Sequence, residues 1–183
     1  MLYGVAAWRL EIVALVPLVA SEIQQLLDNA RVGRIGMVDV NGRPYTIPLR
    51  YVWTGDAVYV RLAHEGRKGD ALALDNHVCF ETDVCAPDFS YYASVVIEGT
   101  MDEVLDEEEK RGALVAYYEK YARLCGLPSP GPNPVIRGIT LRKLKVETLT
   151  GRKNEVSDEV AGLRLPKVTK IHRSRRGEHS ARN

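Results

Sequence analysis

Hydrophobic and polar residues alternate along much of this chain, as they do in strands with one buried face. One alternating run covers residues 34–40, a second covers residues 44–52, and Asn41-Gly42 lies between them. Asn-Gly between two alternating runs is a strong hairpin signal, because both turn positions favour positive φ. Gly55-Asp56 then predicts a second turn, which leads into a third run at residues 57–62. The pattern predicts an antiparallel meander of three strands.

Three more alternating runs extend this pattern. They cover residues 77–83, 92–105 and 137–149. Six strands in mainly antiparallel order lack the regular helix-strand alternation that a doubly wound parallel sheet requires. A closed or partly closed barrel suits them better, because closure removes exposed sheet edges. We therefore expect a mainly β fold with flanking α-helices.

Helical spacing is found in three segments. Ser21 is the expected N-cap of a helix over residues 21–30, and a short helix is expected over residues 67–74. Asp106 and Glu109 have the spacing of a capping box at the start of a third helix. Apolar positions then recur at helical spacing, at Leu114, Tyr117, Tyr118, Tyr121 and Cys125.

The two ends of the chain differ from its centre. Residues 12–20 form an apolar run that contains Pro17 and is too short to span a bilayer. We therefore expect three parts and no membrane span. These are an apolar N-terminal extension (1–20), a folded domain (21–155) and a basic, flexible C-terminal tail (156–183).

Charge is distributed unevenly along the 183 residues. The formal net charge is +1, which argues against a dedicated nucleic-acid binder. Residues 1–141 hold 13 basic and 19 acidic residues, whereas residues 142–183 hold 12 and 5. We interpret the basic tail as a solubilising segment, with a nucleic-acid contact as the alternative. Three cysteines without a C-x-x-C pair fit a reducing compartment and a cytoplasmic location.

Residues 59–68 carry the most informative chemistry. A strand there leads into a turn, then Gly66, then the cations Arg67 and Lys68 at a helix start. Backbone N–H groups at a helix N-terminus, together with two cations, favour an anion such as a phosphate. A solvated charge pair is the alternative interpretation. Neither the P-loop nor the dinucleotide glycine motif is present.

Other catalytic chemistries lack a motif. The four histidines, at positions 64, 77, 172 and 179, share no metal-ligand spacing, so we expect no metal site. The chain contains no G-x-S-x-G motif, and the acidic run at residues 107–109 is typical of a helix N-terminus. Hydrolysis by a nucleophile or by paired carboxylates is therefore not expected.

Several segments together resemble a known family. They are ARVGRIGMVDVNGRPYTIPLRYVW, VYVRLAHEGRKGDAL, HVCFETD and YYASVVIEGTMDEV, followed by EEEKRGAL. In this order they resemble the pyridoxamine 5′-phosphate oxidase-like split-barrel flavoproteins over residues 21–150. The nearest branch holds the Nim-type nitroimidazole-resistance and flavin-nucleotide-binding proteins. The resemblance implies a six-stranded antiparallel split barrel with peripheral helices, a homodimer, and FMN bound at the dimer interface.

The resemblance also implies roles for individual residues. Arg67 and Lys68 match the cationic pair that binds the FMN phosphate. The strand end that lines the flavin corresponds to Arg61, Leu62, Ala63 and His64. The strand whose backbone meets the isoalloxazine edge corresponds to Tyr45, Thr46, Ile47 and Pro48. Ser94 matches a serine near the cofactor, and His64 is the expected catalytic residue beside the ring, where imidazole suits proton donation or substrate positioning.

The function implied is an FMN-dependent oxidoreductase that reduces a small electrophilic or nitroaromatic compound through the flavin. A non-catalytic flavin or haem carrier, or a redox sensor, is the alternative, and haem or a deazaflavin is the alternative ligand. The arginine-bearing C-terminal motif of pyridoxamine phosphate oxidases has no counterpart here, so vitamin B6 oxidation is not expected.

Overall fold

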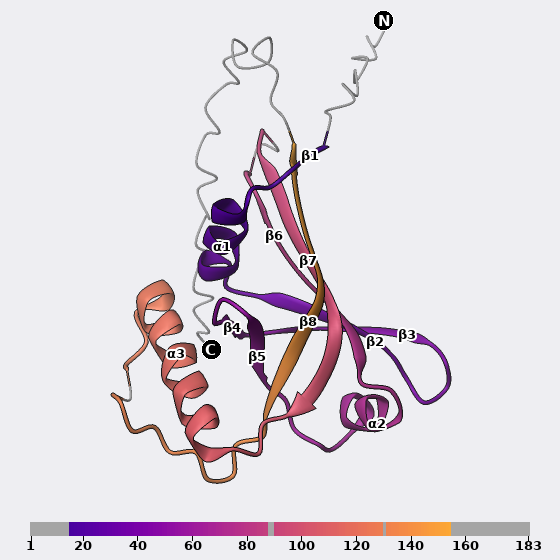
Figure 1. The fold of residues 1–183 in the computed structure, drawn as a ribbon, viewed down its shortest axis with the longest axis vertical. Coiled ribbons are helices and arrows are strands. Elements are labelled where there is room, and N and C mark those ends of the chain that lie inside the picture. The colour runs from indigo at the N-terminus through magenta and orange to yellow at the C-terminus, as the bar shows by residue number, and fades with distance from the viewer. Residues whose placement is uncertain (1–14, 88–89, 130, 155–183) are drawn as a thin grey trace, which may run out of the picture.

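A strongly curved antiparallel sheet organises the computed structural model, which describes residues 15–87, 90–129 and 131–154 (Figure 1). The strand order is β3-β2-β6-β7-β8-β5-β4, and β1 pairs with β8. The strands are β1 (Leu15–Pro17), β2 (Gly33–Val38), β3 (Pro44–Leu49), β4 (Tyr51–Trp53), β5 (Ala57–Arg61), β6 (His77–Cys85), β7 (Tyr92–Glu103) and β8 (Leu141–Asn154). The helices are α1 (Ala20–Asn29), α2 (Arg67–Leu74) and α3 (Glu107–Cys125).

The predicted mainly β fold of split-barrel type is confirmed, with eight strands in the described residues rather than six. One extra strand arises because the run at residues 44–52 is interrupted at Arg50. Before this point β3 pairs with β2, and after it β4 pairs with β5. The chain must leave one partner strand for another to curl the sheet into a barrel. The other extra strand is β1.

The last strand differs from its predicted limits. β8 begins at Leu141 rather than Arg137, and it continues past Leu149 to Asn154. Residues 150–154 lack a clear alternating pattern, yet they pair with β7 on one side and partly with β1 on the other. Tertiary pairing on both sides thus extends a strand that local sequence does not mark.

Two groups of buried side chains form the core. The larger lies inside the curved sheet under α1, and its fully buried members include Leu27, Ile35, Phe80, Ile97 and Leu144. The smaller lies between α3 and the strands β4, β5 and β8, and it includes Val52, Tyr59, Leu114, Tyr117 and Leu141. The helical spacing predicted for α3 is confirmed for Leu114, Tyr117, Tyr118 and Tyr121, whereas Cys125 at its end is exposed. Figure 1 shows α1 and α3 on one side of the sheet and α2 at its lower end.

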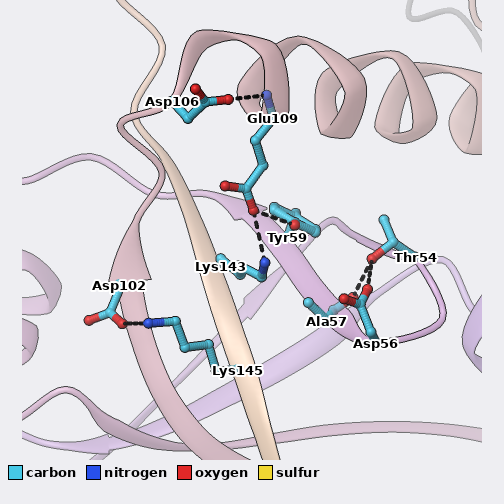
Figure 2. A network of polar contacts seen from close by, with 9 residues as sticks. All are labelled: Thr54, Asp56, Ala57, Tyr59, Asp102, Asp106, Glu109, Lys143 and Lys145. Carbon is cyan, nitrogen blue, oxygen red and sulfur yellow. Dashed lines mark hydrogen bonds and ion pairs between the residues drawn. The ribbon is translucent and has the colours of Figure 1, made fainter.

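The helix starts test the capping predictions. Ser21 is not an N-cap: α1 begins at Ala20, and the Glu22 carboxylate accepts a hydrogen bond from the Val19 N–H at 3.0 Å. The N-cap is Val19, which has no side-chain acceptor, so the Glu22 carboxylate bonding back to the Val19 N–H is the side-chain contact at this helix start. At α3 the predicted N-cap is confirmed, since Asp106 accepts a hydrogen bond from the Glu109 N–H at 2.7 Å (Figure 2). The capping box is not completed, because the Glu109 carboxylate accepts from Tyr59 and Lys143 instead.

The described part of the expected N-terminal extension packs on the domain. Leu18 is buried, and its N–H donates to the Gly151 carbonyl at 2.9 Å. Residues 1–14 and 155–183, which hold the rest of the extension and the basic tail, lie outside the described residues. None of the helices among the described residues has both the length and the apolar character needed to cross a membrane.

Candidate functional site

The turn over residues 62–69 connects β5 to α2 and is named here the 62–69 turn. Gly66 precedes α2 with a φ of 79°, a conformation that glycine adopts without strain. Gly69 packs so closely on the turn that an added Cβ would collide with the His64 carbonyl oxygen. The turn therefore needs both glycines. Sequence reasoning singled out Gly66 but missed Gly69, although the G-R-K-G spacing was visible.

A cavity of about 450 Å³ lies beside this turn. It is lined by Arg61, Leu62, Ala63, Lys68, Tyr117, Gly138, Ile139 and Thr140. Four predicted cofactor-binding residues are thus brought together. The lining contains two cations and no carboxylate, and the first N–H groups of α2 begin next to it. This combination suits an anionic group such as a phosphate.

Arg67 has different surroundings from its neighbour Lys68. Its Nε and Nη2 donate to Oδ2 of Asp39 at 3.1 and 2.7 Å. Its guanidinium carbon also lies over the Tyr45 ring, 4.1 Å from the centroid. Arg67 therefore links α2 to the β2–β3 turn and to the first part of β3. The two predicted phosphate-binding cations do not share one cavity in this chain.

Asp39 is a residue that sequence reasoning missed. It is 2% exposed and accepts hydrogen bonds from the backbone N–H groups of Asn41 and Arg43, both at 2.9 Å. The Arg43 N–H, the Arg67 guanidinium and the Asn41 N–H hold the pKa of Asp39 below its usual range, against the opposing effect of burial. Asp39 thus organises the hairpin turn and anchors Arg67 with one carboxylate.

The predicted ring-binding strand β3 is the last strand of the sheet, and β2 is its strand partner among the described residues. Its outer backbone edge is therefore not used by another described strand. Tyr45 and Ile47 pack against the core, whereas Thr46 and Pro48 are exposed. Tyr45 and Thr46 also line a second cavity of about 560 Å³ over the sheet, with Cys79, Glu98 and Glu147 among its other residues.

His64 lies between two charged side chains. Its Nε2 is 3.2 Å from Oε1 of Glu103, and its Nδ1 is 3.2 Å from Nη2 of Arg142. Glu103 and Arg142 come from β7 and β8, 39 and 78 residues away in sequence. Sequence reasoning missed both, because no local pattern connects them to the turn.

Ser94 does not join these residues. It lies on β7 opposite Asp83 and Arg152, nine residues before Glu103. Nine residues of extended strand span about 30 Å. Within one chain, Ser94 is therefore far from His64 and from the 62–69 turn.

A polar network holds α3 beside the site (Figure 2). Glu109 Oε1 accepts hydrogen bonds from the Tyr59 hydroxyl at 2.7 Å and from Lys143 Nζ at 2.9 Å. Burial and the Glu109 contact raise the pKa of Tyr59, and the Glu109 and Tyr59 contacts raise that of Lys143. The network ties the first turn of α3 to β5 and β8, and so supports the helix that presents Tyr117 to the cavity.

The described residues contain no cluster of side chains that could bind a metal ion. Within residues 15–87, 90–129 and 131–154, no three His, Cys, Asp or Glu side chains are grouped so as to hold a metal ion. The predicted site residues that the structure brings together lie at the 62–69 turn and its cavity.

Comparison with known proteins supports the fold. A family model described as pyridoxamine 5′-phosphate oxidase matches residues 20–153. No curated protein matches the chain. The structure of this chain is similar to that of a candidate 5-nitroimidazole antibiotic resistance protein from Bacteroides thetaiotaomicron. The TM-score is 0.63 and the identity 24%, over 76% of this chain and 87% of that one.

Two further solved structures share the fold. An FAD-binding protein from Mesorhizobium loti has a TM-score of 0.59 and 19% identity, over 78% of this chain and 98% of that one. A heme-binding protein from Mycobacterium smegmatis has a TM-score of 0.54 and 17% identity, over 73% of this chain and 54% of that one. One architecture therefore accompanies different ligands, so the ligand must be argued from the site.

Proposed function

This chain belongs to the pyridoxamine 5′-phosphate oxidase family, and on that premise we propose that it is a flavoprotein that binds FMN beside the 62–69 turn. We propose further that it is an oxidoreductase, which reduces a small electrophilic or nitroaromatic compound. The observation that carries the proposal is the cavity that brings Arg61 and Lys68 together at the start of α2.

The residues present fit the chemistry of FMN. Its phosphate is a dianion, for which Lys68, Arg61 and the first N–H groups of α2 are suitable donors. Ala63 and Ile139 contribute the small apolar part of a cavity lining that is otherwise mostly polar. A bound flavin would supply the electron transfer, while the protein binds, orients and shields it.

Arg67 has an indirect part in this proposal. Its bonds to Asp39 and its position over Tyr45 set the distance between α2 and β3. In the proposal α2 holds the phosphate, and the backbone of β3 from Tyr45 to Pro48 meets the ring edge. Direct contact of Arg67 with the phosphate stays a prediction.

We propose that the site is completed by a second copy of the chain. Ser94 lies about 30 Å along β7 from the strand end that meets His64, so one chain cannot bring both to one small ligand. A homodimer with the cofactor at its interface would allow Ser94 of one copy to approach the turn of the other. The three cysteines are unpaired, which agrees with the proposed cytoplasmic location.

The visible spectrum of the purified chain tests this function. We expect a yellow preparation, or a colourless one that acquires flavin absorbance when FMN is added and excess ligand is removed. Bound FMN should also raise the Tm of the protein. The ligand released by denaturation, identified by mass, separates FMN from FAD, haem and deazaflavin. A preparation that stays colourless with every added flavin would contradict the proposal.

A non-catalytic flavin carrier or redox sensor is the second candidate. It is favoured by the contacts of His64, because both ring nitrogens already have protein partners. Steady oxidation of reduced nicotinamide in the presence of a nitroaromatic acceptor, lost in His64→Gln, would support the enzyme. Flavin binding without turnover under these conditions would support the carrier or sensor.

A further inference from the structure

Arg142 is a charged residue placed where burial is costly. It lies on β8 opposite Val60 of β5 and Glu103 of β7, and it is 8% exposed. Its Nη2 contacts His64, while its buried Nε has no hydrogen-bond partner. A buried donor without an acceptor costs stability, and an apolar side chain would avoid that cost. Stability therefore does not explain an arginine at this position.

The contact between Arg142 and His64 decides the protonation of one ring nitrogen. A guanidinium has hydrogen-bond donors and no acceptor. Nδ1 of His64 must therefore accept the hydrogen bond from Nη2 of Arg142, and it must carry no proton while it does so. A ring protonated at Nδ1 would place its N–H against an N–H of the guanidinium.

The contact on the other side of the ring decides the second nitrogen. Nε2 of His64 is 3.2 Å from a carboxylate oxygen of Glu103, which as a carboxylate can only accept. Nε2 must therefore carry the proton. Within the described residues no ion pair joins Arg142 and Glu103 directly. The imidazole thus bridges a cation and an anion that face each other across two paired strands.

We infer that Arg142 is a positioning residue that holds His64 in the neutral Nε2–H tautomer and fixes its ring plane at the end of the 62–69 turn. The two contacts orient the ring without any cofactor. Arg142 acts through His64, and Glu103 completes the arrangement as the acceptor.

This inference deepens the proposed function, and its bearing on a substrate rests on that function. His64 in this tautomer offers one N–H donor at Nε2 and has no free basic nitrogen there. A substrate group that reaches Nε2 must therefore be an acceptor that takes the place of the Glu103 carboxylate. A nitro or carboxylate oxygen satisfies this condition, whereas an amine that needs a base does not.

Nitrogen NMR of the full chain, labelled with ¹⁵N in histidine and without added flavin, tests the inference. At pH 8, long-range ¹H–¹⁵N spectra separate protonated from unprotonated ring nitrogens, and His64→Gln assigns the His64 signals. His77 is an internal reference, because its Nδ1 lies 2.7 Å from a carboxylate oxygen of Asp75 and must carry the proton. We expect His64 to show the Nε2–H pattern and His77 the Nδ1–H pattern.

Two substitutions separate positioning from packing. Arg142→Met keeps an apolar stem without a donor, and it should shift the His64 signals toward the average of two tautomers while His77 is unchanged. Arg142→Lys restores a donor and should restore the wild-type pattern. Lys145→Met is the matched control, because Lys145 lies on the same strand with its amine paired to Asp102, and it should leave His64 unchanged.

Two results would overturn the inference. One is an Nδ1–H pattern for His64 in the wild-type chain, which needs no variant to fold. The other is an unchanged His64 pattern in a folded Arg142→Met. If Arg142→Met instead loses flavin binding with His64 unchanged, Arg142 belongs to the ligand site. A colourless protein with the expected tautomer would remove the proposed function and leave the positioning role of Arg142 intact.

Discussion

The guanidinium of Arg67 donates from Nε and Nη2 to a single carboxylate oxygen of Asp39, at 3.1 and 2.7 Å. This pair connects the first turn of α2 to the β2–β3 hairpin, in addition to the packing of α2 on β2. It also separates the roles of two adjacent cations, since Lys68 faces the cavity that Arg67 does not line. Substitution of Lys68 is therefore expected to change FMN affinity, and substitution of Arg67 to change stability as well.

Asp39→Asn is expected to make the protein less stable at neutral pH and less sensitive to acid. Hydrogen bonds hold the pKa of the Asp39 carboxyl below its usual range. The stability that this supplies is complete above the unfolded-state pKa, near 4, and is lost as the pH falls through the folded-state value. Thermal unfolding from pH 7 to pH 3 should therefore show a smaller loss of Tm in Asp39→Asn than in the wild type. An equal acid-induced loss in both would contradict this role of Asp39.

Lys68→Ala is expected to weaken FMN binding by roughly 10- to 100-fold, because it removes one charge-assisted phosphate contact. Arg61→Ala should have an effect of similar size. Arg67→Ala should act mainly through the β2–β3 turn, and so lower Tm together with affinity. Titration by flavin fluorescence and thermal unfolding measure the two effects separately.

The control for these cations is Lys145→Ala. Its amine is exposed and paired with Asp102, 2.8 Å away, outside the cavity (Figure 2). Its removal should leave FMN affinity unchanged. If Lys68→Ala binds FMN as tightly as this control, the phosphate lies elsewhere.

Gly69→Ala is expected to destabilise the protein by about 1–3 kcal/mol, because the new Cβ overlaps the His64 carbonyl oxygen. The matched control is Gly112→Ala, at an exposed position of α3 where an added Cβ meets no atom within 4 Å. That change should stabilise the chain by about 0.5–1 kcal/mol. Urea unfolding measures both, and the prediction fails if the two substitutions shift stability in the same direction.

Lys120→Met is expected to reduce the rise in stability between pH 7 and pH 9. The amine donates to the Leu27 carbonyl at 2.8 Å and lies 3.5 Å from the Tyr51 ring centroid, and burial lowers the pKa of Lys120 to about 7. In this window the unfolded chain binds more protons than the folded chain, so stability rises with pH.

The contribution of Lys120 to that rise should be roughly 1–2 kcal/mol and should vanish in Lys120→Met. Urea unfolding at pH 7 and pH 9 measures the difference between the two chains. Both pH values lie below the range in which the buried tyrosines lose their protons. A rise of the same size in both chains would show that the amine of Lys120 is not responsible.

Mixing two variants that each bind FMN weakly tests the proposed two-chain site. Lys68→Ala and Ser94→Trp should each bind FMN weakly as pure proteins. If a site takes Lys68 from one copy and Ser94 from the other, a mixed dimer has one intact site and one doubly altered site. Co-refolded mixtures should therefore recover binding at about one site in each mixed dimer. Recovery would be absent if both residues served the same chain's site, or if the chain were a monomer.

Local patterns were sufficient for most of the fold. The Asn41-Gly42 hairpin, the alternating strands and the helical spacing of α3 depend on neighbours within a few residues, and each is present in the structure. The start of α1 and the limits of β8 were wrong, because Glu22 and the pairing with β7 replace the local signals that were used.

The site residues also fall into those that the sequence could reveal and those that it could not. Gly66, Arg67 and Lys68 could be recognised from adjacent positions, because a turn followed by cations at a helix start is a local feature. The partners of these residues could not be recognised. Asp39 reaches Arg67 across 28 residues, and Arg142 reaches His64 across 78.

Such contacts depend on which strands pair and in what register, and a one-residue change in register reverses the face on which every side chain lies. The sequence alone was thus enough to show where two adjacent cations follow a glycine-containing turn at a helix start. Only the paired strands decided that Arg67 binds Asp39, that Lys68 joins Arg61 beside the cavity, and that His64 is held between Arg142 and Glu103.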